Sequence, residues 1–251
     1  MIQKITKGLL VVIAMSFCTS IFAQDGTYYT VRDLESWTSA QFKYKPSKKW
    51  TISFQEQLRL KDNSSTVSEF FTQGSIKRNL ENKFSVGLGL RYIRENDDEG
   101  KVQGYENHLR WNADLGYKHS LERFKLKYRL RYQSKNEMGT DDIATKTIRL
   151  KAAVGYNVKN WKLDPEVSGE FFSRTNSISE PVKYRLTIGT SYETKNIGEF
   201  GAFYRLEQEL PNTTLSMLTN IIGIKYAYTL KKKKEDTSST EMKKHPNLGV
   251  F

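Results

Sequence analysis

Apolar and polar residues alternate with a period of two along most of this chain. In the clearest segment, from Phe124 to Tyr132, every even position is apolar or aromatic and every odd position is Lys or Arg. Side chains of a β-strand point alternately to opposite faces, so one face of this segment is apolar and the other carries four positive charges. The pattern predicts a strand that separates an apolar medium from a polar one.

The same alternation recurs in eleven segments, and turn-forming or charged residues separate one segment from the next. No helical periodicity of useful length lies between them, which predicts an all-β fold. The apolar faces of the eleven segments fall in residues 34–44, 52–60, 70–76, 84–92, 105–117, 124–132, 148–156, 163–171, 184–192, 200–206 and 222–230.

Short breaks between the segments alternate with longer polar loops, and tyrosine or phenylalanine repeatedly ends the apolar face. Both features are typical of membrane barrels, whose turns are short on the periplasmic side and whose aromatic girdles lie at the two membrane interfaces. Strands of about ten residues also match a tilted crossing of the hydrocarbon layer. The sequence therefore predicts an antiparallel up-and-down transmembrane β-barrel.

The number of strands is expected to lie between ten and twelve, because single-chain bacterial barrels normally have an even number. Two arrangements reconcile this rule with eleven segments. Thr27 to Val31 adds a short first strand, which gives twelve and is the arrangement we favour, or the N-terminal segment threads the lumen and the number is smaller or odd.

The first residues form a separate unit with Lys4 and Lys7 before an apolar run from residue 9 to 17, and Ala23 before the polar Gln24. This pattern predicts a signal peptide cleaved after Ala23. The run is shorter than the roughly 20 residues of a membrane-spanning helix. Cys18 follows the bulky Phe17, so lipoprotein processing is not expected, and the mature chain then has no cysteine for disulfide or thiol chemistry.

Four regions follow from this division: a signal peptide at 1–23, an N-terminal segment or short strand at 24–33, a barrel at 34–230, and a tail at 231–251. The tail opens with four lysines and lacks any alternation, so we expect it to be disordered and periplasmic.

Composition narrows the class further. The formal net charge is +12 and the chain has 12% aromatic residues, with a mean hydropathy of −0.63. No apolar run after residue 23 is long enough for a membrane helix. The basic residues alternate with apolar ones instead of forming a patch with stacking aromatics, so nucleic acid is not an expected partner. Expected partners are outer-membrane lipid, lipopolysaccharide and the outer-membrane assembly machinery of a Gram-negative bacterium, with a monomer as the default state.

Five segments carry a resemblance to a known family: 54–63 (FQEQLRLKDN), 86–95 (VGLGLRYIRE), 128–133 (YRLRYQ), 183–192 (KYRLTIGTSY) and 203–210 (FYRLEQEL). Together they resemble the domain-of-unknown-function family numbered 2490, over roughly residues 34–230. The resemblance implies an exported outer-membrane barrel. It transfers no catalytic residues, because its motifs are strand patterns, and the basic tail departs from the aromatic-rich last strand with which the family usually ends.

If the apolar faces contact lipid, the opposite faces line the lumen with charge. A structural interpretation has the charges neutralise one another across a narrow lumen and plug it. A functional one is a narrow passive pore with a constriction that favours anions. The predicted basic wall is Arg91, Arg110, Lys125, Lys127, Arg129, Arg131, Arg149 and Lys151, and the predicted acidic wall is Glu166, Glu170, Glu207 and Glu209.

Enzymatic residues are not apparent. The three histidines are His108, predicted to face the lumen, His119 near a turn, and His245 in the tail. His108 with Glu106 or Asp114 resembles part of a hydrolase site, but no nucleophile motif accompanies it. We therefore predict no catalytic, cofactor-binding or metal-binding residues. Two alternatives stay open: a lipid- or polymer-modifying enzyme of the outer membrane, and a soluble exported ligand-binding barrel.

Two acidic features need an explanation of their own. Glu56 is predicted to point to the apolar side between Phe54 and Leu58, which either a bulge at residues 55–57 or a position near the headgroups relieves. The acidic loop 96–99 lacks the spaced ligands of a calcium loop, so we interpret it as solvated.

Overall fold

The computed structural model describes residues 29–98, 103–159, 161–176, 180–194, 197–210 and 215–232. The expected signal peptide and all but the first two residues of the expected tail lie outside the described residues. In the described part every regular element is a β-strand, which confirms the all-β prediction. That part contains no helix long and apolar enough to cross a membrane.

The described residues form eleven strands. Their bounds are β1 Tyr29–Lys45, β2 Trp50–Lys61, β3 Thr66–Asn79, β4 Phe84–Asp97, β5 Gly104–Leu121, β6 Phe124–Glu137, β7 Thr145–Tyr156, β8 Leu163–Arg174, β9 Glu180–Thr194, β10 Gly198–Glu209 and β11 Leu215–Lys231.

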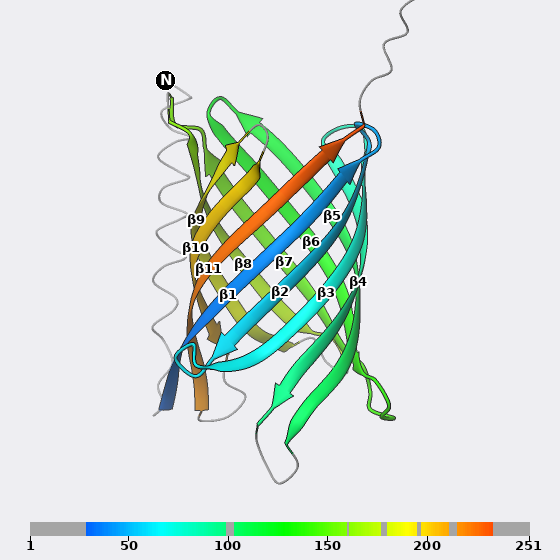
Figure 1. The fold of residues 1–251 in the computed structure, drawn as a ribbon, viewed down its shortest axis with the longest axis vertical. Coiled ribbons are helices and arrows are strands. Elements are labelled where there is room, and N and C mark those ends of the chain that lie inside the picture. The colour runs from blue at the N-terminus through cyan, green and yellow to red at the C-terminus, as the bar shows by residue number, and fades with distance from the viewer. Residues whose placement is uncertain are drawn as a thin grey trace, which may run out of the picture.

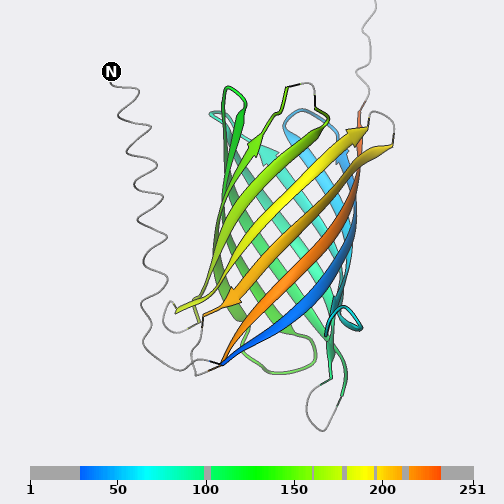
Figure 2. The same cartoon turned by 90° about the vertical axis from the view of Figure 1, so that its left-hand side faces the viewer.

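The strands close into one barrel in chain order, and Figures 1 and 2 show them tilted around a common axis. Each strand pairs antiparallel with its neighbours in the chain, whereas the closing pair, β1 with β11, is parallel from Tyr29 opposite Leu215 to Lys45 opposite Lys231. An odd number of alternating strands requires this, because the first and last then run in the same direction. Figure 1 shows the two side by side.

The favoured number of twelve strands is therefore corrected to eleven, still within the expected range. The expected extra strand ran from Thr27 to Val31, and its described part is residues 29–31. These residues form no separate strand, because they belong to an unbroken β1 that continues to Lys45. The barrel thus begins within the segment 24–33 that the sequence had set apart. A fully antiparallel sheet was also expected, and the parallel closing pair is the exception.

The barrel has two ends, which we name by their connections. The turn end, at the top in Figure 1, carries the connections after β1, β3, β5, β7 and β9; the loop end carries those after β2, β4, β6, β8 and β10. The contrast in length is weaker than the sequence indicated, since the connections 46–49 and 62–65 are equally long. β1 starts at the loop end and β11 finishes at the turn end.

Local geometry at the turns follows from residue type. Asn82 and Lys83, between β3 and β4, both have positive φ, 55° and 70°, as the tight turns that match strand twist require. At the loop end the Asp33 carboxylate accepts hydrogen bonds from the backbone N–H groups of Asp62 (3.1 Å) and Asn63 (2.9 Å). This contact ties the β2–β3 turn to β1.

Large apolar side chains of this barrel are exposed and many polar ones are buried, which is the reverse of a domain with an apolar core. Large apolar side chains on every strand are exposed on the outer face, for example Leu88 at 60% and Ile224 at 57%. The inner face holds most of the buried residues, and more of these are polar or charged than apolar. The faces predicted from the alternation are the faces observed, so one closed sheet separates an apolar exterior from a polar lumen.

Glu56 is exposed on the outer face, as its position in the alternation predicts. The register is regular through Gln55, Glu56 and Gln57, so a bulge there is excluded, and the irregularity of this pair lies between Arg59 and Leu60. Thr72 on the neighbouring strand donates a hydrogen bond to the Glu56 carboxylate, with oxygen–oxygen distances of 2.7 and 2.8 Å.

One close approach inside the lumen depends on a glycine. A Cβ atom at Gly223 of β11 would lie 2.1 Å from the ring of Phe203, which extends from β10 over that position. Only a residue without a side chain leaves room for the ring.

We expect Gly223→Val to lower the free energy of unfolding by about 1–3 kcal/mol, because the new side chain overlaps the Phe203 ring inside the lumen. Urea unfolding of the purified folded protein, followed by tryptophan fluorescence, measures this. Gly74→Val is the matched control, since nothing lies within 4 Å of a Cβ there. Equal midpoints for the two variants would contradict the packing described.

Candidate functional site in the barrel lumen

The predicted wall residues occupy the lumen side of their strands. Glu166, Glu170 and Glu207 form ion pairs inside the barrel, whereas Glu209, at the end of β10, has a side chain that is 49% exposed. The basic residues run from β4 to β7, and Arg91, Arg131 and Arg149 are buried. Buried charges of this kind require nearby partners.

The cations meet acids on nearby strands. From β6, Lys127 Nζ lies 2.6 Å from Glu166 Oε2 and Arg129 Nη2 lies 2.7 Å from Glu170 Oε1, both on β8. Arg131, also on β6, binds Asp114 of β5 through two hydrogen bonds of 2.6 and 2.7 Å. Charge compensation is therefore local along the sheet, and an acid lies within the predicted basic wall.

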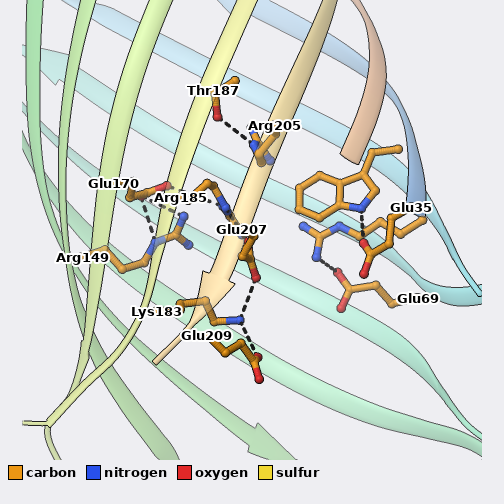
Figure 3. A network of polar contacts seen from close by, with 12 residues as sticks. Glu35, Glu69, Arg149, Glu170, Lys183, Arg185, Thr187, Arg205, Glu207 and Glu209 are labelled. Carbon is orange, nitrogen blue, oxygen red and sulfur yellow. Dashed lines mark hydrogen bonds and ion pairs between the residues drawn. The ribbon is translucent and has the colours of Figure 1, made fainter. Parts of the chain in front are cut away.

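Glu170 is the central acceptor of the lumen. Besides Arg129, its carboxylate lies 2.9 Å from Arg149 Nη2 on β7 and 3.5 Å from Arg185 Nη1 on β9. Figure 3 shows Arg149 and Arg185 converging on it. Three arginines from three strands thus share one buried carboxylate.

A second acidic centre lies next to the first. Arg185 also pairs with Glu207 of β10, and Lys183 Nζ lies 2.9 Å from the same carboxylate. Lys183 contacts Glu209 at 3.6 Å, and Arg205 Nε donates to Thr187 at 3.0 Å (Figure 3). Cations therefore stand within the predicted acidic wall too.

Aromatic rings also contact the arginine side chains of the lumen, including arginines that pair with carboxylates. The guanidinium of Arg91 lies 3.3 Å from the centroid of Phe71, and that of Arg59 lies 3.7 Å from Trp37. Arg149 lies 4.4 Å from the centroid of Phe172. Desolvated contacts of this kind contribute more than exposed ones, so these rings stabilise guanidinium groups away from water.

The sequence carried a signal for these rings that the alternation alone did not use. Glu-Phe-Phe occurs twice, at 69–71 and at 170–172. Two adjacent aromatics on a strand must point to opposite faces, so one of each pair has to enter the lumen. The inward members are Phe71 and Phe172, and Glu69 pairs with Arg59 at 2.7 Å.

We call this closely packed layer the lumen plug. Its aliphatic and aromatic members are almost inaccessible, with Phe71 and Ile221 each 1% exposed, and Arg149 and Glu170 are 8% and 7% exposed. The layer consists of Trp37, Arg59, Glu69, Phe71, Arg91, Arg149, Glu170, Phe172, Arg185, Arg205, Glu207 and Ile221.

Between the plug and the turn end the lumen widens into two adjoining cavities, which we call the vestibule. Their volumes are about 500 and 320 Å³, and both are lined by Lys127, Lys151 and Glu166. Small residues make the space, since serine, glycine and alanine occupy lumen positions such as Ser85, Gly116 and Ala153.

His108 lies in the loop-end half of the lumen. Its Nε2 is 3.1 Å from Glu106 and 3.4 Å from Glu95. Asp114, the other acid considered beside it, has both carboxylate oxygens bonded to Arg131. His119 Nδ1 lies 3.2 Å from Lys83 Nζ in a turn-end contact, and His245 lies outside the described residues.

The acidic loop after β4 is partly described. Lys61 donates a hydrogen bond to the Asp98 carboxylate, and this bond lowers the pKa of Asp98 below its ordinary value. Among the described residues, no group of three or more His, Cys, Asp or Glu side chains is placed to hold a metal ion.

Glu170→Gln tests the central acceptor. We expect a loss of about 3–5 kcal/mol in the free energy of unfolding, because three guanidinium groups inside the lumen, including the buried Arg149, lose their shared counter-charge. Urea unfolding of this variant, of the control Glu209→Gln and of the wild type provides the measurement. Glu209→Gln, in which an exposed carboxylate is changed, should cost only about 0–1 kcal/mol. Similar losses for both would show that Glu170 has no central role.

Comparison with known proteins gives one matching family model and no curated relative. A search of curated proteins finds no match. The family model described as protein of unknown function DUF2490 matches residues 34–214, which is more than half of the chain. This range runs from within β1 to the residue before β11 and so covers nearly all of the barrel. The chain belongs to the DUF2490 family, as the strand motifs of its sequence predicted.

Proposed function

We propose that this protein is an outer-membrane β-barrel of a Gram-negative bacterium, exported by its N-terminal peptide, and that its lumen is closed to ion flow. Of the two functions considered, a narrow passive pore and a closed structural barrel, the geometry favours the closed barrel. The membrane placement and the closure depend on different observations.

The exposed apolar belt is the observation that carries the membrane placement. Each of the eleven described strands presents at least one large apolar side chain that is about 40% or more exposed, such as Phe42 on β1, Leu150 on β7 and Ile222 on β11. Soluble monomers rarely expose an apolar patch of more than a few hundred Å². A belt around the whole barrel is stable when hydrocarbon surrounds it, which disfavours a soluble ligand-binding barrel.

Aromatic pairs border this belt at both ends. Near the turn end, Phe84 packs on Tyr117 with ring centroids 4.9 Å apart, and Phe124 packs on Tyr156 at 5.0 Å. Toward the loop end, Phe70 lies 6.2 Å from Tyr105. Tyrosine and tryptophan favour membrane interfaces because their rings are apolar and their tips are polar, so two girdles support one transmembrane belt.

The lumen plug supports closure. Its charged members are paired with each other or packed on aromatic faces, and its apolar members Phe71 and Ile221 are almost fully buried. Ion conduction needs a continuous wet path with sites that bind weakly. Close contact among the guanidinium, carboxylate and aromatic groups of this layer supports a lumen without such a path.

Cysteine labelling in whole cells tests placement and orientation. The mature chain has no native cysteine once Cys18 leaves with the signal peptide, so single cysteines report cleanly. We expect an impermeant maleimide to label Thr140→Cys, in the β6–β7 connection at the loop end. Lys48→Cys, at the turn end, should react only after lysis. Labelling of Lys48→Cys alone would reverse the orientation, and recovery in the soluble periplasmic fraction without detergent would contradict membrane placement.

Planar-bilayer recording tests closure. Refolded wild-type protein should insert without unitary current steps, because the plug fills the lumen, whereas a general porin in the same bilayer provides the positive control. Phe71→Ala combined with Arg91→Ala removes two stacked plug side chains and should produce steps. Stable unitary conductance of the wild type would show that the barrel is a pore.

A further inference from the structure

The vestibule has a strong excess of positive charge. Eight cationic and two acidic side chains line its larger cavity in the described residues. The cations are Lys43, Lys45, Lys77, Lys118, Lys127, Arg129, Arg131 and Lys151, and the acids are Asp114 and Glu166. The plug, in contrast, holds five arginines and three glutamates, with aromatic rings packed on its guanidinium groups, so the excess is larger in the turn-end half.

Like charges stand directly opposite each other on neighbouring strands of the vestibule wall. Lys118 of β5 is paired in register with Lys127 of β6, and Arg129 of β6 with Lys151 of β7. Such pairs destabilise a sheet unless a counter-charge intervenes. Glu166 forms an ion pair with Lys127, and Glu170 forms one with Arg129. The second member of each pair, Lys118 or Lys151, has no ion pair of its own among the described residues.

Four lysines of the cavity make no ion pair among the described residues: Lys45, Lys77, Lys118 and Lys151. They come from β1, β3, β5 and β7 and therefore surround the cavity on several sides. Arg129 adds a donor, because its Nε is buried without a hydrogen-bond partner in the protein. The wall therefore offers several cationic donors to one enclosed volume.

The shape of the cavity limits what can enter it. At about 500 Å³ the larger cavity is in the range of small-molecule sites. Its lining includes Lys45 and Asn79, the last residues of β1 and β3, so it reaches the turn end. All neighbouring strands are hydrogen-bonded around the closed sheet, which gives a lipid no lateral entrance. A soluble solute entering from the turn end meets the plug and stops there.

We propose that the vestibule binds a soluble anion that carries two or more phosphate groups, with Lys77, Lys118 and Lys151 as the principal ligands. Several unbalanced lysines in one cavity require a ligand with several negative charges, and lysine binds phosphate as a compact point charge. Low-dielectric walls lined with one sign of charge also concentrate such anions. The inference depends on the lumen alone and holds whether or not the barrel conducts.

Isothermal titration of the folded protein in a neutral detergent with sodium tripolyphosphate tests the proposal. We expect saturable binding that weakens with added salt. The triple variant Lys77→Gln, Lys118→Gln, Lys151→Gln should bind about tenfold more weakly or worse, because three charge-assisted contacts are lost. The matched control Lys49→Gln, Lys146→Gln, Lys159→Gln removes the same charge from exposed positions outside the cavity and should bind within about twofold of wild type.

Three results would overturn the proposal: no saturable binding to wild type, equal weakening in both triple variants, or binding seen only in vesicles of phosphatidylglycerol and never with tripolyphosphate. The last would assign the phosphate to a lipid headgroup. Heat-modifiable migration of each variant on gels verifies folding first. If the cavity triple variant does not fold, single Lys77→Gln and Lys151→Gln variants replace it, and each should weaken binding by a measurable fraction of the triple effect.

Discussion

Arginine side chains from seven of the described strands enter the lumen of one closed barrel, and several of them are buried there. A buried charge is tolerated when carboxylates, amides or aromatic faces surround it. Glu170 supplies this for Arg129, Arg149 and Arg185 together, so one carboxylate links arginines from three strands. The strands concerned, β6 to β9, are neighbours, and the same contacts hold their relative register.

Side-chain size then divides the lumen into two halves with different chemistry. Arginine and aromatic residues fill the middle, where Phe71 and Phe172 cover guanidinium groups. Serine, glycine and lysine occupy the turn-end positions, and their small or flexible side chains leave a cavity. Arginines outnumber glutamates by five to three where the packing is tight, and cations outnumber acids by eight to two where space remains, so the more strongly cationic vestibule lies beside a more nearly balanced plug.

The outer face of the sheet is apolar, and several of its few polar side chains form hydrogen bonds with one another. Apolar residues face outward on every strand, and the few polar ones there find partners, as Glu56 does with Thr72. Tyr92 and Tyr204 donate their hydroxyl protons to Asn107 and Asn220. Because side chains alternate between the inner and outer faces along each strand, a register shift of one residue would place the apolar side chains of that strand in the lumen and its polar ones outside. The parallel seam between β1 and β11 preserves this alternation around the full circle.

The sequence by itself determined which residues are strands, which face each side chain takes and that the lumen is charged, because a period of two is a local property that survives in any sheet. It predicted the inward position of His108 and the outward position of Glu56 for the same reason. Only the tertiary structure showed that the barrel closes without a twelfth strand, through a parallel seam. It alone also showed the convergence of arginines on Glu170 and the lack of an ion pair for Lys77 and Lys118 among the described residues. These depend on how far the closed sheet brings distant strands together, and on the register and tilt that set which side chains share a layer.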